Sequence, residues 1–339
     1  MNTAINAPKQ PKARLLEIDR AKGLAIFLVV LGHIVAGQPP EGNRWFSHVI
    51  TIIYSFHMPF FMYLSGFVML YSYKRIESIA AYWDYVWSKT KRLAPGFLLF
   101  ALIILLGKIL SSRFLHVDNM PPDFWRGLID ILVVPGESSA KTLWFIYVLL
   151  ELYIVFPILM ILTGGRYSLI ITVALILHFV PATRVFMIAD LFEYLVYFAI
   201  GACIASRFQS VERAIDRYGW IFLGLFVASI SLVYVEMSQQ LAKLLIGTLS
   251  IPALHFMIRM SPLSGSKLLL QWGLLSYAIY LMNTIAIGFS KGMIFQFTSW
   301  DYLNFLWVAP VLVCAGLYVP ILVKLYVFPR IGPLDRITN

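Results

Sequence analysis

Ten apolar segments, spread along almost the whole chain, constrain this sequence more than any other feature. A segment of about 20 apolar residues matches the length of a helix that crosses a hydrocarbon core about 30 Å thick. The sequence therefore predicts an all-α polytopic integral membrane protein with about ten transmembrane helices. The fifth and seventh segments are short and are expected to be short or partly re-entrant. We place the ten segments near residues 18–37, 48–71, 94–112, 143–162, 167–182, 186–205, 219–235, 242–258, 270–290 and 303–326.

Composition agrees with a membrane location. Of the 339 residues, 60% are hydrophobic and only 13% are charged, far from the balance of a soluble domain. Both cysteines, Cys203 and Cys314, lie in apolar segments without metal-ligand spacing, so we expect neither a disulfide framework nor a metal site. The sequence contains no phosphate-binding loop, dinucleotide fingerprint or zinc-protease motif. ATP hydrolysis, dinucleotide chemistry and zinc proteolysis therefore have no support from sequence motifs.

The basic residues are distributed asymmetrically around the predicted spans. Of the 27 lysines and arginines, 18 fall on the side of the amino terminus, seven on the other side and two within spans. Cytoplasmic connections are the ones enriched in basic residues, so both termini are expected in the cytosol. This distribution accounts for the net charge of +10 without a nucleic-acid partner.

The domain organisation predicted from these patterns is simple. Residues 1–15 are polar and basic and are expected to form a disordered cytosolic tail, for which a cleaved signal peptide is the weaker interpretation. Residues 16–328 are expected to form one transmembrane domain, and residues 329–339 a cytosolic C-terminal tail. Residues 113–142 are the longest outer connection and are either a binding loop or a solvated connector.

The stretch DRAKGLAIFLVVLGHIV carries a basic residue and a histidine on one apolar helix. Lys22 and His33 are separated by nearly three helical turns, so they share a face about 16 Å apart along the axis. With Lys22 at the cytosolic interface, His33 lies deep in the membrane, where an ionisable side chain usually has a function. A neutral imidazole is a suitable general base near neutral pH. A histidine that only joins helices is the alternative.

Two further stretches supply possible partners. In YSFHMPFFMYLSGF, the second span brings His57 to a depth close to that of His33 from the opposite face, and Pro59 is expected to kink the helix there. His57 is expected either to take part in catalysis or to brace the kink. In WSKTKRLAPGF, a basic cluster precedes a proline that opens the third predicted span. The cluster lies on the same side as Lys22 and would suit phosphate groups, although any inner loop is basic. It consists of Lys89, Lys91 and Arg92.

Later spans contain other polar side chains in apolar surroundings. Glu151 lies in TLWFIYVLLELYIVFP and should pair with a buried lysine or orient a histidine, because an isolated carboxylate in lipid is costly. Trp144 in the same stretch is either an interfacial anchor or part of a ligand site. In SYAIYLMN, Asn283 shares a helix face with Ser276 and Tyr280, an arrangement that more often joins helices than binds substrate.

These stretches, in this order over residues 17 to about 328, resemble the membrane acyltransferase-3 family, in its branch of stand-alone O-acetyltransferases of bacterial surface sugars. The resemblance implies that Lys22 and His33, eleven positions apart, are tied to activity. This chain has Lys22 where many relatives have arginine, so a point charge replaces a bidentate phosphate grip. It has Asn283 where relatives often have histidine. Some relatives carry a fused extracellular domain that is absent from this sequence.

The resemblance implies a multi-pass O-acyltransferase of the bacterial cytoplasmic (inner) membrane. It would transfer an acyl group, most simply acetyl, from cytosolic acyl-CoA to a carbohydrate hydroxyl, with His33 and His57 in catalysis and no permanently bound cofactor. The expected partners are acyl-CoA, a surface or lipid-linked carbohydrate, and membrane lipids. The expected substrate-binding residues are Lys22, Lys89, Lys91, Arg92, Glu151, Trp144 and Asn283. The alternatives are a transporter or flippase of a lipid-linked sugar and a non-catalytic assembly partner.

Overall fold

The computed structural model describes residues 14–35, 40–72, 76–113 and 119–338, and its regular structure within these ranges is helical. The predicted N-terminal tail lies almost entirely outside the described residues. The main helices are α1 (Leu16–His33), α2 (Arg44–Tyr71), α3 (Ile79–Ser111), α4 (Phe124–Val133), α5 (Trp144–Leu162), α6 (Tyr167–His178), α7 (Ile188–Ser206), α8 (Phe208–Ser229), α9 (Gln239–Arg259), α10 (Lys267–Leu274), α11 (Ser276–Ile294), α12 (Tyr302–Leu322) and α13 (Gly332–Ile337).

Within the described ranges, seven helices are long and apolar enough to cross a membrane, and α10 with α11 adds an eighth if this bent pair is one broken span. Two predicted spans are not among these helices. The helix α1 carries too many charges, with four charged residues in its first two turns, and α6 is too short, with only 12 residues. The prediction of a polytopic all-α membrane protein is therefore confirmed. The count of ten spans remains a prediction.

Three predicted boundaries are wrong. The third helix begins at Ile79 rather than near residue 94, because Ser78 caps it by accepting a hydrogen bond from the Ala81 amide, and Pro95 lies inside it. The seventh segment is not short, since α8 already begins at Phe208 and has 22 residues. The first helix ends at His33, four residues earlier than expected. The histidine thus lies at a helix end.

The ninth predicted span is a broken helix, because α10 and α11 meet at an angle of 85°. The short helix α10 packs closely against α1, with glycines at the contact. A Cβ atom on Gly23 would overlap the carbonyl of Leu269, and one on Gly273 would overlap the carbonyl of Asp19. Glycine permits this backbone approach. Because α10 is held against the N-terminal half of α1, only α11 continues along the bundle.

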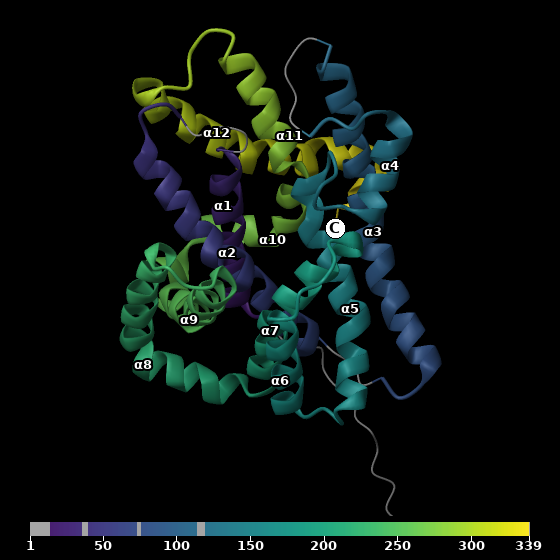
Figure 1. Cartoon of the computed structure of the whole chain (residues 1–339), viewed down its shortest axis with the longest axis vertical. Coiled ribbons are helices and arrows are strands. Elements are labelled where there is room, and N and C mark those ends of the chain that lie inside the picture. Colours follow the sequence, from purple (N-terminus) through teal and green to yellow (C-terminus); the bar gives the residue numbers. More distant parts are fainter. Residues whose placement is uncertain (1–13, 36–39, 73–75, 114–118, 339) are drawn as a thin grey trace, which may run out of the picture.

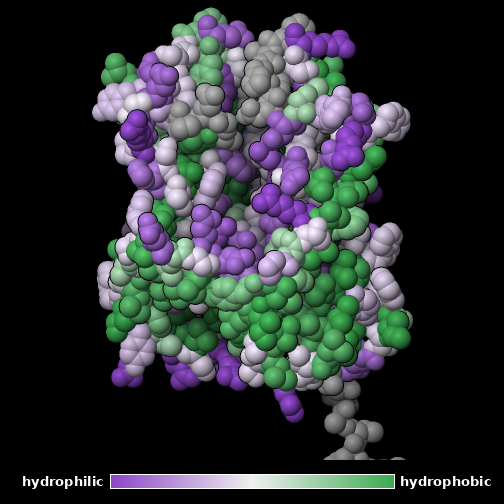
Figure 2. All heavy atoms as spheres, viewed as in Figure 1, coloured by the Kyte–Doolittle hydropathy of each residue, from purple (hydrophilic) through white to green (hydrophobic). Residues whose placement is uncertain are grey.

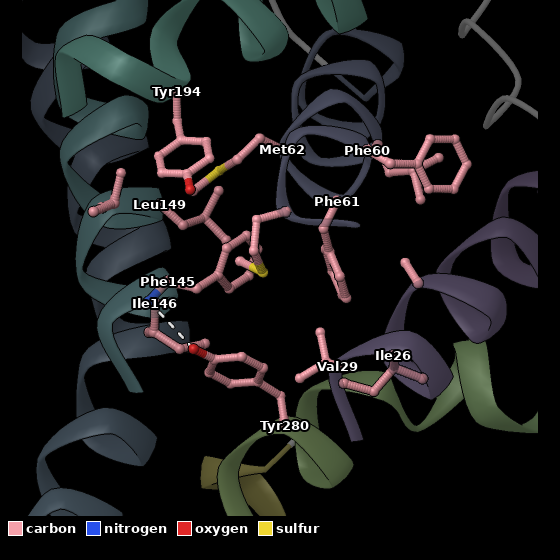
Figure 3. Packing of buried hydrophobic residues seen from close by; sticks show 14 of the residues in the cluster. Ile26, Val29, Phe60, Phe61, Met62, Phe145, Ile146, Leu149, Tyr194 and Tyr280 are labelled. Carbon is pink, nitrogen blue, oxygen red and sulfur yellow. Dashed lines mark hydrogen bonds between the residues drawn. The ribbon is translucent and has the colours of Figure 1, made fainter. Parts of the chain in front are cut away.

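In the centre of the bundle α1 and α2 lie between two groups of helices, α8 and α9 on one side and α3 and α5 on the other (Figure 1). The most extensive helix contact is between α2 and α7. Buried aromatic and aliphatic side chains of α1, α2, α5 and α11 fill the space around Phe61, Phe145 and Tyr280 (Figure 3). The Tyr280 hydroxyl accepts a hydrogen bond from the Phe145 amide at 3.2 Å and donates one to the Thr142 carbonyl at 2.7 Å. These bonds tie α11 to the start of α5.

The surface is divided into two zones on the face drawn in Figure 2. Its lower half is predominantly hydrophobic, as expected of a surface that faces lipid. In its upper half, hydrophilic side chains surround a hollow near the middle of the view.

The end of the chain packs back onto the bundle. Lys324, which is 6% exposed, donates hydrogen bonds to the carboxylate of Asp335 at 2.7 Å and to its carbonyl at 2.9 Å. The short helix α13, which contains Asp335, contacts α3. The predicted C-terminal tail thus includes a helix that supplies a counter-ion to a lysine in a predicted span.

Candidate active site

His33 forms a hydrogen bond with Asn283, a residue 250 positions later in the chain. The distance between His33 Nδ1 and Asn283 Oδ1 is 2.7 Å. Asn283 is fully buried on α11, and its amide nitrogen donates to the carbonyls of Ile279 at 2.9 Å and Tyr280 at 2.8 Å. These two bonds orient the amide so that its oxygen faces the imidazole.

The orientation of the Asn283 amide determines which nitrogen of the His33 imidazole carries the proton. An amide oxygen only accepts hydrogen bonds, so the neutral His33 must carry its proton on Nδ1. Its Nε2 then has a free lone pair, and within the described residues it has no hydrogen-bond partner. His33 is half-buried. The site therefore presents a base of defined tautomer at the end of α1.

His57 lies close to His33, as the sequence predicted. The two side chains are near enough to interact electrostatically. His57 Nδ1 donates to the carbonyl of Ile53 at 2.8 Å, which leaves its Nε2 as an acceptor. The ring of Tyr54 stacks on His57 with 5.2 Å between centroids. The Tyr54 hydroxyl donates to the carbonyl of Gly32, next to His33, at 3.0 Å. Tyr54 thus joins the two histidine-bearing helices, a role that sequence reasoning missed.

Basic side chains gather near the opposite end of α1. Asp19 is buried and accepts from Arg14 at 2.5 Å and from Lys22 at 3.4 Å. Arg92 of α3 also lies within electrostatic range of Lys22. Asp19 is thus paired with two cations, and a third, Arg92, acts on Lys22; this excess of positive charge suits a phosphate-bearing ligand.

The three basic residues of α3 do not all make the same contacts. Lys89 lies over the rings of Tyr85 and Tyr153, at 5.4 and 5.1 Å from their centroids. Lys91 lies over Trp87 at 5.0 Å and is exposed. Arg92 lies within electrostatic range of both Lys22 and Lys89. A phosphate site that includes the three basic residues of α3 stays a prediction, and Lys91 is the residue whose contacts lie apart.

Among the residues that the structure describes, Glu151 has neither of its expected partners. Its Oε2 atom is buried without a hydrogen-bond partner within the described part of the chain. Asp190 is the charged residue that acts on it most. No described lysine or histidine pairs with it, because the helix packed beside it, α7, brings an acid to this position. Trp144 lies at the start of α5 with its ring 5.1 Å from that of Tyr194.

The described residues hold no group of three or more His, Cys, Asp or Glu side chains arranged to bind a metal ion. The polar groups that the structure brings together are instead an oriented imidazole at one end of α1 and a cationic group near the other. Such a pair suits proton transfer at one end and binding of an anionic ligand at the other.

Comparison with protein families identifies the class of this protein. The model of the acyltransferase-3 family, described as an acyltransferase domain, matches residues 15–325. The chain therefore belongs to the acyltransferase-3 family, and its apolar helices make it a multi-pass membrane member.

Two curated relatives of the chain are both named nodulation protein NolL. The protein from Mesorhizobium japonicum is 26% identical over 222 residues, which are 64% of this chain and 55% of the relative. The protein from Sinorhizobium fredii is 24% identical over 208 residues, or 60% of this chain and 52% of the relative. The matched region thus spans about half the length of these relatives. No solved structure matches the chain.

Proposed function

We propose that this protein is a membrane O-acyltransferase that transfers an acyl group, with acetyl the favoured one, from cytosolic acyl-CoA to a hydroxyl of a surface or lipid-linked carbohydrate. The observation that carries the proposal is the bond between His33 and Asn283, because it leaves His33 Nε2 free to accept a proton. The family match over residues 15–325 supports acyl transfer rather than transport. The bacterial inner membrane is the proposed location.

In the proposed reaction, Nε2 of His33 removes the proton from the acceptor hydroxyl as its oxygen attacks the thioester carbonyl. The tetrahedral intermediate collapses and expels the CoA thiolate, which takes the proton back from the imidazolium. The products are an O-acyl ester and free CoA. Asn283 Oδ1 accepts a hydrogen bond from Nδ1–H throughout and stabilises the imidazolium, so Asn283 is a positioning residue. His57 supports the proton transfer from its place beside His33.

The donor is proposed to enter from the cytosolic side. Its phosphates would replace Asp19 as the partner of Lys22 and would also contact Arg92, with Lys89 nearby. Lys22 and His33 are about 16 Å apart along α1, a separation that an extended pantetheine arm spans. Glu151 and Trp144 are proposed to contact the carbohydrate acceptor.

The test is acyl transfer by the purified protein in lipid nanodiscs, followed by CoA release and by labelled acyl groups on the carbohydrate. His33→Gln is expected to lower kcat by about 10²–10⁴-fold. Lys22→Ala is expected to raise the KM for acyl-CoA with a smaller effect on kcat. His48→Ala, which changes an exposed histidine at the start of α2, is the matched control.

Wild-type turnover in His33→Gln would exclude His33 as the base, and an unchanged KM in Lys22→Ala would remove its role in donor binding. A wild-type protein that moves a lipid-linked sugar across the bilayer but leaves the thioester intact would instead support the flippase alternative.

A further inference from the structure

The proposed acyl transfer creates a negative charge that neither His33 nor Asn283 can stabilise. When the acceptor oxygen attacks the thioester, the carbonyl oxygen becomes an oxyanion, and its charge is lost again when the bond from carbon to sulfur breaks. Hydrogen-bond donors aimed at such an oxyanion lower the barrier. The Nδ1 proton of His33 is engaged with Asn283, and Nε2 takes the proton of the acceptor. The reaction therefore needs a further donor beside His33.

Most polar side chains around His33 have no proton left for a substrate. The amide nitrogen of Asn283 donates to two backbone carbonyls. The hydroxyls of Tyr54 and Tyr280 and the Nδ1 atom of His57 each donate to a backbone carbonyl as well. A tyrosine hydroxyl carries one proton and a neutral imidazole carries one. Within the described part of the chain, these four side chains are therefore already used as donors.

One pair of hydroxyl groups keeps a spare proton. The Oγ1 atoms of Thr142 and Thr284 are 3.4 Å apart, and either can be the donor. Their mutual hydrogen bond uses one proton, whereas the two hydroxyls carry two. Among the described residues neither hydroxyl has a second partner. Both threonines are partly exposed, so the remaining proton is accessible to a ligand.

This pair lies beside the amide that orients His33. Thr284 follows Asn283 on α11, with about 3.8 Å between their Cα atoms, and its side chain lies about 100° further around the helix. There it meets Thr142 of the short helix η1 (Lys141–Leu143). Tyr280, one turn earlier on α11, donates to the carbonyl of Thr142 at 2.7 Å and so fixes η1 at this level. One turn of α11 thus carries the amide that holds the base and, next to it, a hydroxyl with an available proton.

We infer that Thr284 is a catalytic residue whose hydroxyl donates a hydrogen bond to the oxyanion of the tetrahedral intermediate, an inference that rests on the proposed acyl transfer. The Thr142 hydroxyl donates to Thr284 and polarises it. No covalent bond to threonine forms, and Thr284 keeps its proton throughout. The hydroxyl of Ser139 also lacks a partner among the described residues, but Ser139 is only 4% exposed, so a substrate does not reach it.

The experiment compares threonine variants in the nanodisc assay of acyl transfer. Thr284→Val removes the hydroxyl and nearly keeps the volume, so kcat should fall about hundredfold. The KM for acyl-CoA should not change, because the lost bond forms only in the transition state. Thr284→Ser should keep most of the rate, and Thr142→Val should lose less than Thr284→Val. Thr51→Val, which changes an exposed threonine of α2, is the matched control.

Wild-type kcat in Thr284→Val, together with an inactive His33→Gln, would overturn this inference and leave the proposed function intact. Equal losses in Thr284→Val and Thr284→Ser would show that Thr284 acts through packing, and so would a fall in the Tm of Thr284→Val. A larger loss in Thr142→Val would overturn the assignment of the donor to Thr284. Absence of acyl transfer by the wild-type protein would overturn the proposed function itself, and this inference with it.

Discussion

The hydrogen bond between His33 and Asn283 decides which nitrogen of the imidazole is available. The side-chain nitrogen of Asn283 donates hydrogen bonds to two backbone carbonyls of α11. These bonds fix the orientation of the amide, so its oxygen faces His33. A histidine whose tautomer is fixed in this way keeps the same lone pair in every molecule. The sequence alone indicated that Asn283 replaces a histidine common in relatives. It did not indicate that the amide still serves as an acceptor.

Replacement of Asn283 by leucine should therefore lower kcat without changing the KM for acyl-CoA. A hydrogen bond to a group that becomes charged contributes about 1.5–3 kcal/mol, so the expected loss is about tenfold to a hundredfold. Asn283→His should recover part of the rate, because an unprotonated imidazole nitrogen can also accept a hydrogen bond from Nδ1–H of His33. The measurement is steady-state kinetics in nanodiscs. Equal losses in the leucine and histidine variants would show that Asn283 only fills space.

Helix packing is governed by glycines at a few close contacts. Gly66 of α2 and Gly201 of α7 lie at the most extensive helix contact, where added Cβ atoms would overlap the carbonyls of Phe198 and Tyr63. Gly224 of α8 has no neighbouring atom within 4 Å of an added Cβ. In sequence the three glycines look alike, since each lies within an apolar helix. Only the tertiary contact distinguishes them.

Gly201→Ala should consequently destabilise the protein, whereas Gly224→Ala should not. Alanine favours a helix by about 1 kcal/mol relative to glycine, so Gly224→Ala is expected to stabilise slightly or be neutral. At Gly201 the overlap with backbone atoms, which cannot move aside, should cost about 1–3 kcal/mol. Thermal unfolding in detergent measures both. A rise in Tm for Gly201→Ala would contradict the close α2–α7 contact.

At the scale of the whole molecule, different contacts stabilise the two ends of the last predicted span, which contains α12. The N-terminal end of α12 is capped by Asp301, whose side chain accepts from the Asn304 amide at 3.0 Å. At the other end, Lys324 is buried and depends on Asp335 of α13. The segment after the family match thus completes the charge balance of the bundle.

Removal of the Asp335 carboxylate should destabilise the protein more than removal of the lysine. Among the described residues, Asp335→Ala leaves the buried ammonium with the carbonyl of residue 335 as its hydrogen-bond acceptor, at an expected cost of about 2 kcal/mol. Lys324→Met removes the charge and keeps the volume, so its cost should be smaller. The Tm values of the two variants, measured by thermal unfolding in detergent, rank their losses of stability. The reverse order would show that the pair does not stabilise α13.

The predicted orientation is also a property of the whole molecule. In a variant without Cys203 and Cys314, a single Phe297→Cys in the connection after α11 should react with a membrane-impermeant maleimide added to intact cells. Phe297 is 89% exposed. A single Arg330→Cys should react only after permeabilisation, because both termini are predicted in the cytosol. Reaction of Arg330→Cys in intact cells would invert the topology.

Local patterns in the sequence were sufficient to predict the class of fold, an all-α membrane protein. Apolar length predicts membrane helices because backbone groups in lipid must be paired within the segment. Helical spacing placed Lys22 and His33 on one face because both belong to one continuous helix, α1. Family resemblance followed from the same two residues and from the stretch around His57. These features depend on neighbours within a few turns.

Only the tertiary structure decided how the helices combine. The start of α3, the 85° bend between α10 and α11, and the different contacts of Lys91 and Arg92 depend on which helix packs beside which. Such contacts join residues far apart in the chain and leave no periodic signal in the sequence. The sequence by itself therefore determined a membrane protein with a histidine and a lysine on one helix face. The packing of α11 against α1 determined which nitrogen of His33 is free, because the orienting amide of Asn283 comes from another helix.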